Sequence, residues 1–193
     1  MNKYLSELIQ TRRTIRQYER RPIARETLDM LVNAARLAPS AANLQPLEFL
    51  VVDDDKLCPS VLARLKWAAY IAPNGNPKPG HEPAAYIVVL VNTDIREKMY
   101  EYDVGAAQMS MILAAWSEGI ASCWIMSVDK AELTPLLGLP KNMKVDSVLA
   151  LGHPFEKSVA EEYTDSVKYW KDESGLFHVP KKRLDKVVHH NKY

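Results

Sequence analysis

The most regular hydrophobic pattern in the chain lies in residues 26–38. Its apolar side chains fall at the i, i+3, i+4 and i+7 spacing of one helical face: Leu28, Leu31, Val32 and Ala35. Pro39 follows and ends the predicted helix. Residues 102–118 are apolar on nearly all sides, which predicts a second helix that is buried over most of its surface. Gly119 stands where a left-handed cap would end this second helix.

Shorter apolar segments predict further helices and the strands. Residues 59–70 are predicted to be helical, and Asp129 opens another helix as an N-cap with a glutamate three residues later. Four short apolar runs predict strands over residues 47–53, 84–92, 121–126 and 145–151. The run 84–92 is almost continuous in apolar residues, which is typical of a strand covered on both faces.

Turn-forming residues divide the rest of the chain. Residues 72–83 carry four prolines and two glycines among polar residues, which predicts a surface loop without regular structure. We expect the wider segment 66–83 to form a lid or loop. Residues 167–170 and 176–179 flank the polar stretch 172–175 and predict a hairpin.

Length and composition are those of an ordinary globular protein. The chain has 193 residues, of which 47% are hydrophobic and 25% are charged. The mixture of helices and strands predicts an α+β sandwich over one domain, residues 1–193. Helix 102–118 is too apolar for one subunit to cover, so we expect a homodimer. Its side chains Met109, Met111 and Trp116 are expected in the core and the dimer interface.

Charge and cysteine content exclude several classes of protein. The formal net charge of +1 argues against nucleic acid and against a membrane surface as partners. No apolar run is long enough to span a bilayer, and the first four residues do not open a signal peptide. Cys58 and Cys123 are too few for a disulfide framework and are expected to be inert, and the histidines lack the spacing of metal ligands. These features predict a soluble, cytoplasmic protein.

Cationic residues nevertheless gather near the two ends of the chain. Residues 11–16 read TRRTIR, and residues 180–184 read PKKRL. Neither a G-x-G-x-x-G nor a G-x-x-x-x-G-K-[ST] motif is present, so a bound phosphate would be held by arginine side chains instead of a glycine-rich loop. The same two clusters are also typical of a solvated helix start and of an ordinary charged tail.

Several short motifs occur together in the order found in one known family. They are residues 12–16 (RRTIR), 38–46 (APSAANLQP), 103–108 (DVGAAQ), 119–127, 151–154 (LGHP) and 180–183 (PKKR). As a set they resemble the nitroreductase family of FMN-dependent oxidoreductases over nearly the whole chain. The resemblance implies a three-layer sandwich, with a central mixed or antiparallel sheet flanked by helices, in a domain-intertwined homodimer that binds FMN at its interface. The C-terminal extension, residues 156–193, is then expected to pack on the partner subunit.

The resemblance also implies which residues bind FMN. The phosphate and one ring edge would be lined by Arg12, Arg13, Thr14 and Arg16. The flavin of the other subunit would be reached by Pro39, Ser40, Ala41, Ala42, Asn43 and Gln45. The isoalloxazine ring would lie beside Ile125, Met126 and Ser127, and the phosphate or ribityl chain would contact Lys181 and Arg183. Lys182 is expected to face solvent, and Leu47 stands where many relatives carry tryptophan.

On this resemblance the chain is an FMN-dependent oxidoreductase that uses NADH or NADPH. Hydride would pass to flavin N5 in a ping-pong cycle, and an electron-poor small molecule, such as a nitroaromatic or a quinone, would then be reduced. Because the flavin carries the chemistry, no catalytic acid, base or nucleophile is expected from the protein. Three alternatives stay open: a reductive dehalogenase-like or flavin-fragmenting enzyme of the same fold, a flavin-binding or sensing protein with little turnover, and a small-anion binding module.

Overall fold

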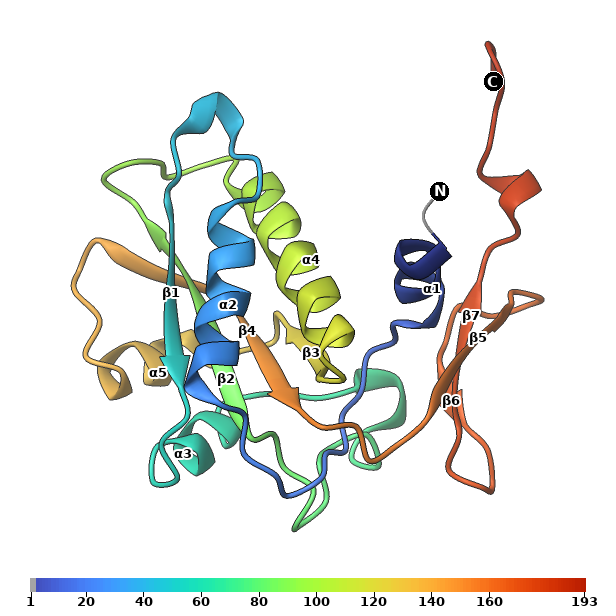
Figure 1. Ribbon diagram of the computed structural model, residues 1–193, viewed down its shortest axis with the longest axis horizontal. Helices are drawn as coiled ribbons and strands as arrows, with labels where there is room; N and C mark the ends of the chain where they lie inside the picture. Colours follow the sequence, from blue (N-terminus) through green and yellow to red (C-terminus); the bar gives the residue numbers. More distant parts are fainter. Residues whose placement is uncertain (1–2) are drawn as a thin grey trace.

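A four-stranded antiparallel sheet forms the centre of the protein (Figure 1). The computed structural model describes residues 3–193. The sheet has the order β1-β2-β4-β3, and its strands are β1 (Leu47–Val52), β2 (Ala85–Asn92), β3 (Ala121–Ile125) and β4 (Met143–Gly152). All three strand pairs are antiparallel. The strands therefore lie close to the four ranges that the apolar runs predicted.

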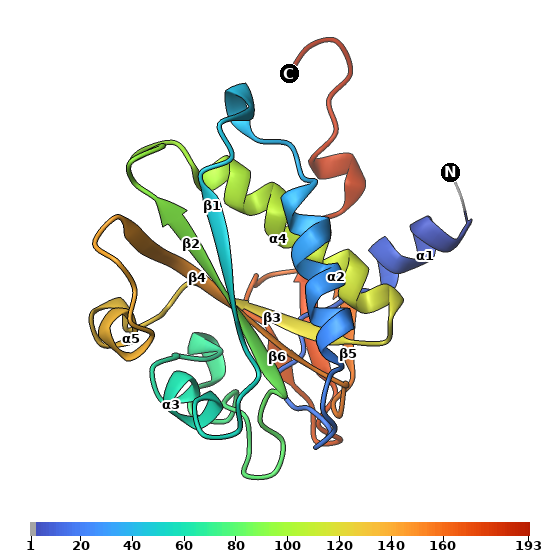
Figure 2. The same cartoon turned by 60° about the vertical axis from the view of Figure 1, so that its left-hand side comes forward.

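Helices cover both faces of this sheet (Figure 2). On one face lie α2 (Arg25–Arg36) and α4 (Glu101–Ser117), and on the other lie α3 (Cys58–Leu62) and α5 (Lys130–Leu136). Strand β2 contributes to both cores, because Ile87 and Val89 pack toward α2 and α4 whereas Val88 and Leu90 pack toward α3 and α5. The α+β three-layer sandwich is thus confirmed, and the continuous apolar run of β2 reflects its burial on two sides.

Asp129 caps α5 as its sequence suggests, whereas the methionines of α4 differ in burial. The Asp129 side chain accepts a hydrogen bond from the backbone N–H of Glu132 at 3.1 Å, which caps α5 as predicted. Met111 is fully buried in the core, whereas Met109 is 40% exposed on the single chain. Contact of Met109 with a partner subunit stays a prediction.

The C-terminal residues form a second, smaller sheet beside the main one (Figure 1). Its order is β5-β7-β6, with β5 (Ser158–Glu162), β6 (Trp170–Lys171) and β7 (Phe177–Lys181). Strands β6 and β7 are antiparallel, which confirms the predicted hairpin in a shortened form. Strand β5 pairs with β7 in parallel and was not predicted. A short 3-10 helix, η3 (Leu184–Lys186), precedes the end of the chain.

The helix expected over residues 59–70 was wrong beyond its first turn. Helix α3 ends at Leu62, after which the chain runs beside residues 127–129 and the backbone N–H of Lys66 donates to the Ser127 carbonyl at 3.0 Å. Leu65 and Trp67 are both buried while Lys66 between them is exposed. This alternation suits an extended segment, so tertiary packing prevails over helix propensity here. A single 3-10 turn, η2 (Ala69–Ile71), follows before the irregular loop 72–84.

The N-terminal helix α1 (Lys3–Thr11) lies beside α4 and carries no buried residue. The indole Nε1–H of Trp116 on α4 donates to Thr11 Oγ1 at 2.9 Å and holds the end of α1 in place. The apolar residues Leu5 and Ile9 of α1 stay exposed on the single chain. Within the part of the chain that the structure describes, no helix is both long and apolar enough to cross a membrane.

Candidate functional site

The arginine segment 12–16 lies against the edge of strand β3. The backbone N–H of Ile15 donates to the Ser122 carbonyl at 3.1 Å, and Thr14 forms a parallel bridge with the same residue. Ile15 is buried, and the hydroxyl of buried Tyr18 donates to the Ile15 carbonyl at 2.5 Å. These buried side chains fix the backbone between the arginines. Residues 12–16, called the arginine strap below, are therefore an anchored segment and not a solvated helix start.

The arginines of this strap lie in an electrostatically unfavourable position. Burial, and next the neighbouring Arg13 cation, lowers the pKa of the Arg12 guanidinium, and burial lowers the pKa of Arg13. Among the described residues, no acceptor is found for the buried Nε–H groups of Arg13 and Arg16. Crowded cations with free donors are stabilised by an anion that accepts these hydrogen bonds.

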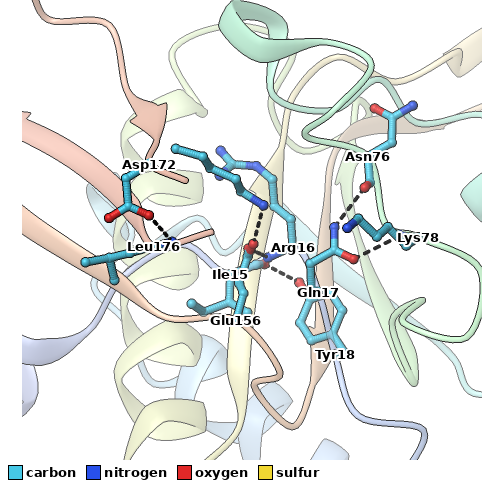
Figure 3. A network of polar contacts seen from close by, with 10 residues as sticks. Ile15, Arg16, Gln17, Tyr18, Asn76, Lys78, Glu156, Asp172 and Leu176 are labelled. Carbon is cyan, nitrogen blue, oxygen red and sulfur yellow. Dashed lines mark hydrogen bonds and ion pairs between the residues drawn. The ribbon is translucent and has the colours of Figure 1, made fainter. Parts of the chain in front are cut away.

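The side chain of Arg16 is held by the C-terminal sheet. Its guanidinium lies over the rings of Tyr169 and Phe177, at 5.2 and 5.0 Å from the ring centroids. Its backbone N–H donates to Glu156 Oε1 at 2.6 Å (Figure 3). Glu156 Oε2 accepts from Lys171 Nζ at 2.7 Å. The Glu156 side chain is only 6% exposed. Arg16 is therefore fixed through both its backbone and its guanidinium.

Gln17 connects the arginine strap to the irregular loop. Its amide Nε2–H donates to the Asn76 carbonyl at 2.8 Å, and its Oε1 accepts from the Lys78 backbone N–H at 3.0 Å (Figure 3). Gln17 is 4% exposed. An open cavity of about 870 Å³ lies between this loop and the turn 172–175, with Gln17, Lys78 and Glu156 in its wall. Sequence reasoning did not identify Gln17 or Glu156, because a single polar residue gives no spacing pattern.

The loop 39–45 lies at the other end of the subunit, beyond α2 and beside the start of α4 (Figure 1). Its centre is the 3-10 turn η1 (Ala41–Asn43), and residues 41–45 are exposed. It is held by Asp103 of α4, which accepts hydrogen bonds from Ser40 and Ala41. Within one chain this loop and the arginine strap are therefore separate.

Residues 125–127 close the C-terminal end of β3. Ile125 is buried in the core on the α3 and α5 side, whereas Met126 is 70% exposed. The Ser127 carbonyl accepts from the Lys66 backbone N–H, which ties this end of β3 to the chain after α3. Met126 is therefore exposed directly after β3, the strand against which the arginine strap lies.

Lys181 and Arg183 lie at the end of β7 and just beyond it, and both are exposed. The Arg183 guanidinium donates to Asp185 Oδ1 at 2.9 Å and to Glu162 Oε1 at 3.2 Å. The hydrogen bond to Asp185, and next the charge of Glu162, raises the pKa of Arg183. Lys182 is exposed, as expected. No hydrogen bond or ion pair joins these residues to the arginine strap among residues 3–193.

The two cysteines lie in surroundings that disfavour the reactive thiolate. Burial is the largest cause that raises the pKa of Cys58 and of Cys123, in each case to about 11. Both are free thiols. No group of metal-binding side chains is present among the residues that the structure describes.

Comparison with known proteins identifies the family. The model of the nitroreductase family matches residues 9–153, and the chain therefore belongs to this family. A protein of Archaeoglobus fulgidus, provisionally named NADH dehydrogenase/NAD(P)H nitroreductase, is 33% identical over 168 residues, which cover 82% of this chain and 90% of the relative. The iodotyrosine deiodinase of Thermotoga neapolitana is 26% identical over 170 residues, which cover 79% of this chain and 89% of that protein.

Solved structures show the same fold. The crystal structure of a provisionally named nitroreductase from Desulfovibrio desulfuricans, in complex with FMN, superposes with a TM-score of 0.72. It is 22% identical, and the match covers 100% of this chain and 99% of that one. The fold of this chain is thus nitroreductase-like.

The donors in the arginine strap fit the phosphate of FMN. Arg12 and Arg13 bring two positive charges to one short segment, and the buried Nε–H of Arg13 has no acceptor among the described residues. Arginine forks match the tetrahedral oxygens of a phosphate. The residues present are therefore chemically suited to this cofactor.

Proposed function

We propose that the protein is an FMN-dependent oxidoreductase that takes electrons from NADH or NADPH and reduces an electron-poor small molecule, such as a nitroaromatic or a quinone. The observation that carries this proposal is the pair of buried, unpaired donors, Arg13 Nε–H and Arg16 Nε–H, in a chain of the nitroreductase family. When bound, FMN would supply the two-electron chemistry in a ping-pong cycle.

In this proposal the arginine strap holds the cofactor. Arg12, Arg13 and Thr14 would bind the phosphate and one ring edge. Arg16, backed by Tyr169 and Phe177, would keep a fixed positive charge beside the ring system. A fixed cation stabilises negative charge that develops on reduction, so it would raise the reduction potential of the bound flavin.

The strap alone gives only part of the site. Residues 125–127, where Met126 is exposed at the end of β3, would lie beside the isoalloxazine ring. Lys181 and Arg183 would contact the phosphate or the ribityl chain. For Arg183 this requires part of its present bonding to Asp185 and Glu162 to be exchanged for the cofactor.

The remaining contacts would come from a second subunit. The loop with Pro39, Ser40, Ala41, Ala42, Asn43 and Gln45 lies at the opposite end of the subunit from the strap, which supports a role in the partner's site. Exposed Leu5, Ile9 and Met109 support a homodimer, because contact with a partner would remove these apolar side chains from water. The extension 156–193 would take part in the same interface.

Reductive dehalogenation is a second candidate. It is supported by the 26% identity to the iodotyrosine deiodinase of Thermotoga neapolitana. An acceptor series that contains a nitroaromatic, a quinone and an iodophenol separates the two reactions. Release of iodide without reduction of the first two acceptors would favour dehalogenation.

The first test is a visible spectrum of the purified protein before and after anaerobic addition of NADH or NADPH. We expect an oxidised-flavin band that bleaches with one or both donors. A band that persists would favour a flavin-binding or sensing protein with little turnover. If no band appears even after FMN is added, the proposal is wrong and a small-anion binding module becomes the better explanation.

A further inference from the structure

Asp103 is a buried carboxylate with both oxygens turned to the loop 39–45. It is 4% exposed and lies in the first turn of α4. Its Oδ2 accepts from the Ser40 hydroxyl at 2.6 Å, and its Oδ1 accepts from the Ala41 backbone N–H at 3.1 Å. Ser40 Oγ in turn accepts from the Gln45 backbone N–H at 2.9 Å. The carboxylate therefore holds the start of the turn directly and its end through the Ser40 hydroxyl.

The turn that Asp103 holds is strained. Ala42, Asn43 and Gln45 have φ angles of 53°, 55° and 52°, in the left-handed region that favours glycine. For Ala42 and Gln45 this conformation is unfavourable, and their exposed side chains provide little packing to offset it, whereas asparagine tolerates it better. Hydrogen bonds to a buried charge are strong enough to keep the turn in this form. Strain maintained in an exposed loop indicates that its shape has a use.

We propose that Asp103 is a positioning residue for the flavin site: it fixes the loop 39–45 in the conformation that meets the flavin held by the partner subunit. This inference rests on the proposed function, because the flavin contact of the loop belongs to it. The residues of the loop make the contact, and Asp103 acts only through them. The N-terminus of α4 stabilises the carboxylate in place, since its backbone N–H groups carry partial positive charge.

The test compares D103N with E101Q in the 193-residue chain. Glu101 lies in the same helical turn and is exposed, so E101Q removes the same charge without touching the loop. Hydrogen exchange of residues 39–46 reports how firmly the loop is held, and quenching of flavin fluorescence gives the Kd for FMN. We expect D103N to speed exchange and to raise the Kd about tenfold, as for the loss of a charge-assisted hydrogen bond. E101Q should change neither quantity.

A second variant covers the case in which D103N does not fold. S40A removes only the hydroxyl that bridges Asp103 and Gln45, and it should change exchange and Kd in the same direction by a smaller factor. In S40A/D103N the loss of exchange protection and of FMN affinity should not exceed that in D103N alone, because both changes act through one hydrogen-bonded unit.

Two results would overturn the positioning role of Asp103 alone, and a third would overturn the proposed function as well. Unchanged exchange in D103N and S40A would show that Asp103 does not hold the loop, and faster exchange with an unchanged Kd would show that its hold is irrelevant to flavin; either overturns the proposal. If the unaltered protein binds no FMN, the proposed function fails and the positioning role fails with it. The exchange data would still show in that case whether Asp103 holds the loop, so the two failures are distinguishable.

Discussion

The backbone N–H of Arg16 donates to Glu156 Oε1 at 2.6 Å, across 140 residues of sequence. The second oxygen of the same carboxylate accepts from Lys171 Nζ at 2.7 Å. Glu156 thereby joins the arginine strap, the chain after β4 and the small C-terminal sheet at one buried point (Figure 3). The placement of Arg16 depends on parts of the chain that are distant from it in sequence.

Substitution of Glu156 by Gln should destabilise the protein and weaken FMN binding together. The amide can still accept one hydrogen bond, but Lys171 loses its counter-charge at a site where it is only 22% exposed. We expect the free energy of unfolding in urea to fall by roughly 1–3 kcal/mol. Glu173 lies in the wall of the same cavity and is exposed, so E173Q is the matched control and should stay close to wild type. Equal behaviour of the two variants would contradict the role of Glu156.

Arg12 should matter more for FMN binding than Arg183. The pKa of Arg12 is lowered by burial and by Arg13, so an anion bound there relieves an unfavourable charge, whereas Arg183 already bonds to Asp185 and Glu162. We expect R12A to raise the Kd for FMN at least about tenfold. R183A should have a smaller effect, R12A/R183A should be purified without flavin, and K182A serves as the control. Full retention of FMN by the double variant would refute the assignment of these residues.

Most of the sandwich could be predicted because its elements have simple local patterns. The continuous apolar run of β2 and the one-sided pattern of α2 follow directly from burial on two faces and on one face. Helix α1 was not predicted, and two further segments could not be predicted in this way. Leu65 and Trp67 are buried by an extended segment that pairs with residues 127–129, and the largely exposed strand β5 exists only through its pairing with β7.

The candidate site could likewise be predicted only in part. The arginine strap was visible as a cluster of like charges, and the structure holds it against β3. Glu156 and Asp103 were not recognised as supporting residues, because each is one acidic residue among 24 and the strap or loop that it holds lies 62 to 140 residues away. Long-range hydrogen bonds of this kind leave no periodic trace in one sequence.

The C-terminal sheet should respond to pH through His178. Its Nδ1 lies 2.8 Å from Glu161 Oε2 and its Nε2 lies 3.3 Å from Asp172 Oδ2, while its ring stacks on Trp170 at 4.1 Å. The hydrogen bond with Glu161, and next that with Asp172, raises the pKa of His178 above its ordinary 6.5. Hydrogen bonds lower the pKa of Glu161, where Trp170 is the largest cause, and of Asp172, where Ser174 is.

The stability of the C-terminal sheet therefore depends on pH in two directions. The stabilisation from charged His178 is fully present below pH 6.5 and is lost as the pH rises through its raised pKa, whereas that from the two carboxylates is lost as the pH falls through their lowered pKa values. The difference in Tm between wild type and H178Q should therefore be larger at pH 6 than well above the raised pKa of His178. H190Q, in the exposed tail, should show no such trend. A Tm difference that is independent of pH would contradict the ion pairs.

Gly152 makes room for the residue that anchors the arginine strap. A Cβ at this position would lie 2.6 to 2.8 Å from side-chain atoms of Tyr18, and the backbone of Gly152 is not left-handed, so the constraint is one of space alone. Tyr18 is fully buried and cannot move aside without disturbing its hydrogen bond to the Ile15 carbonyl. We expect G152A to lower the free energy of unfolding by about 1–3 kcal/mol, the range for overpacked cores. It should also weaken FMN binding, since the strap shifts with Tyr18. Wild-type stability and FMN affinity in G152A would show that the contact between Gly152 and Tyr18 does not set the position of the strap.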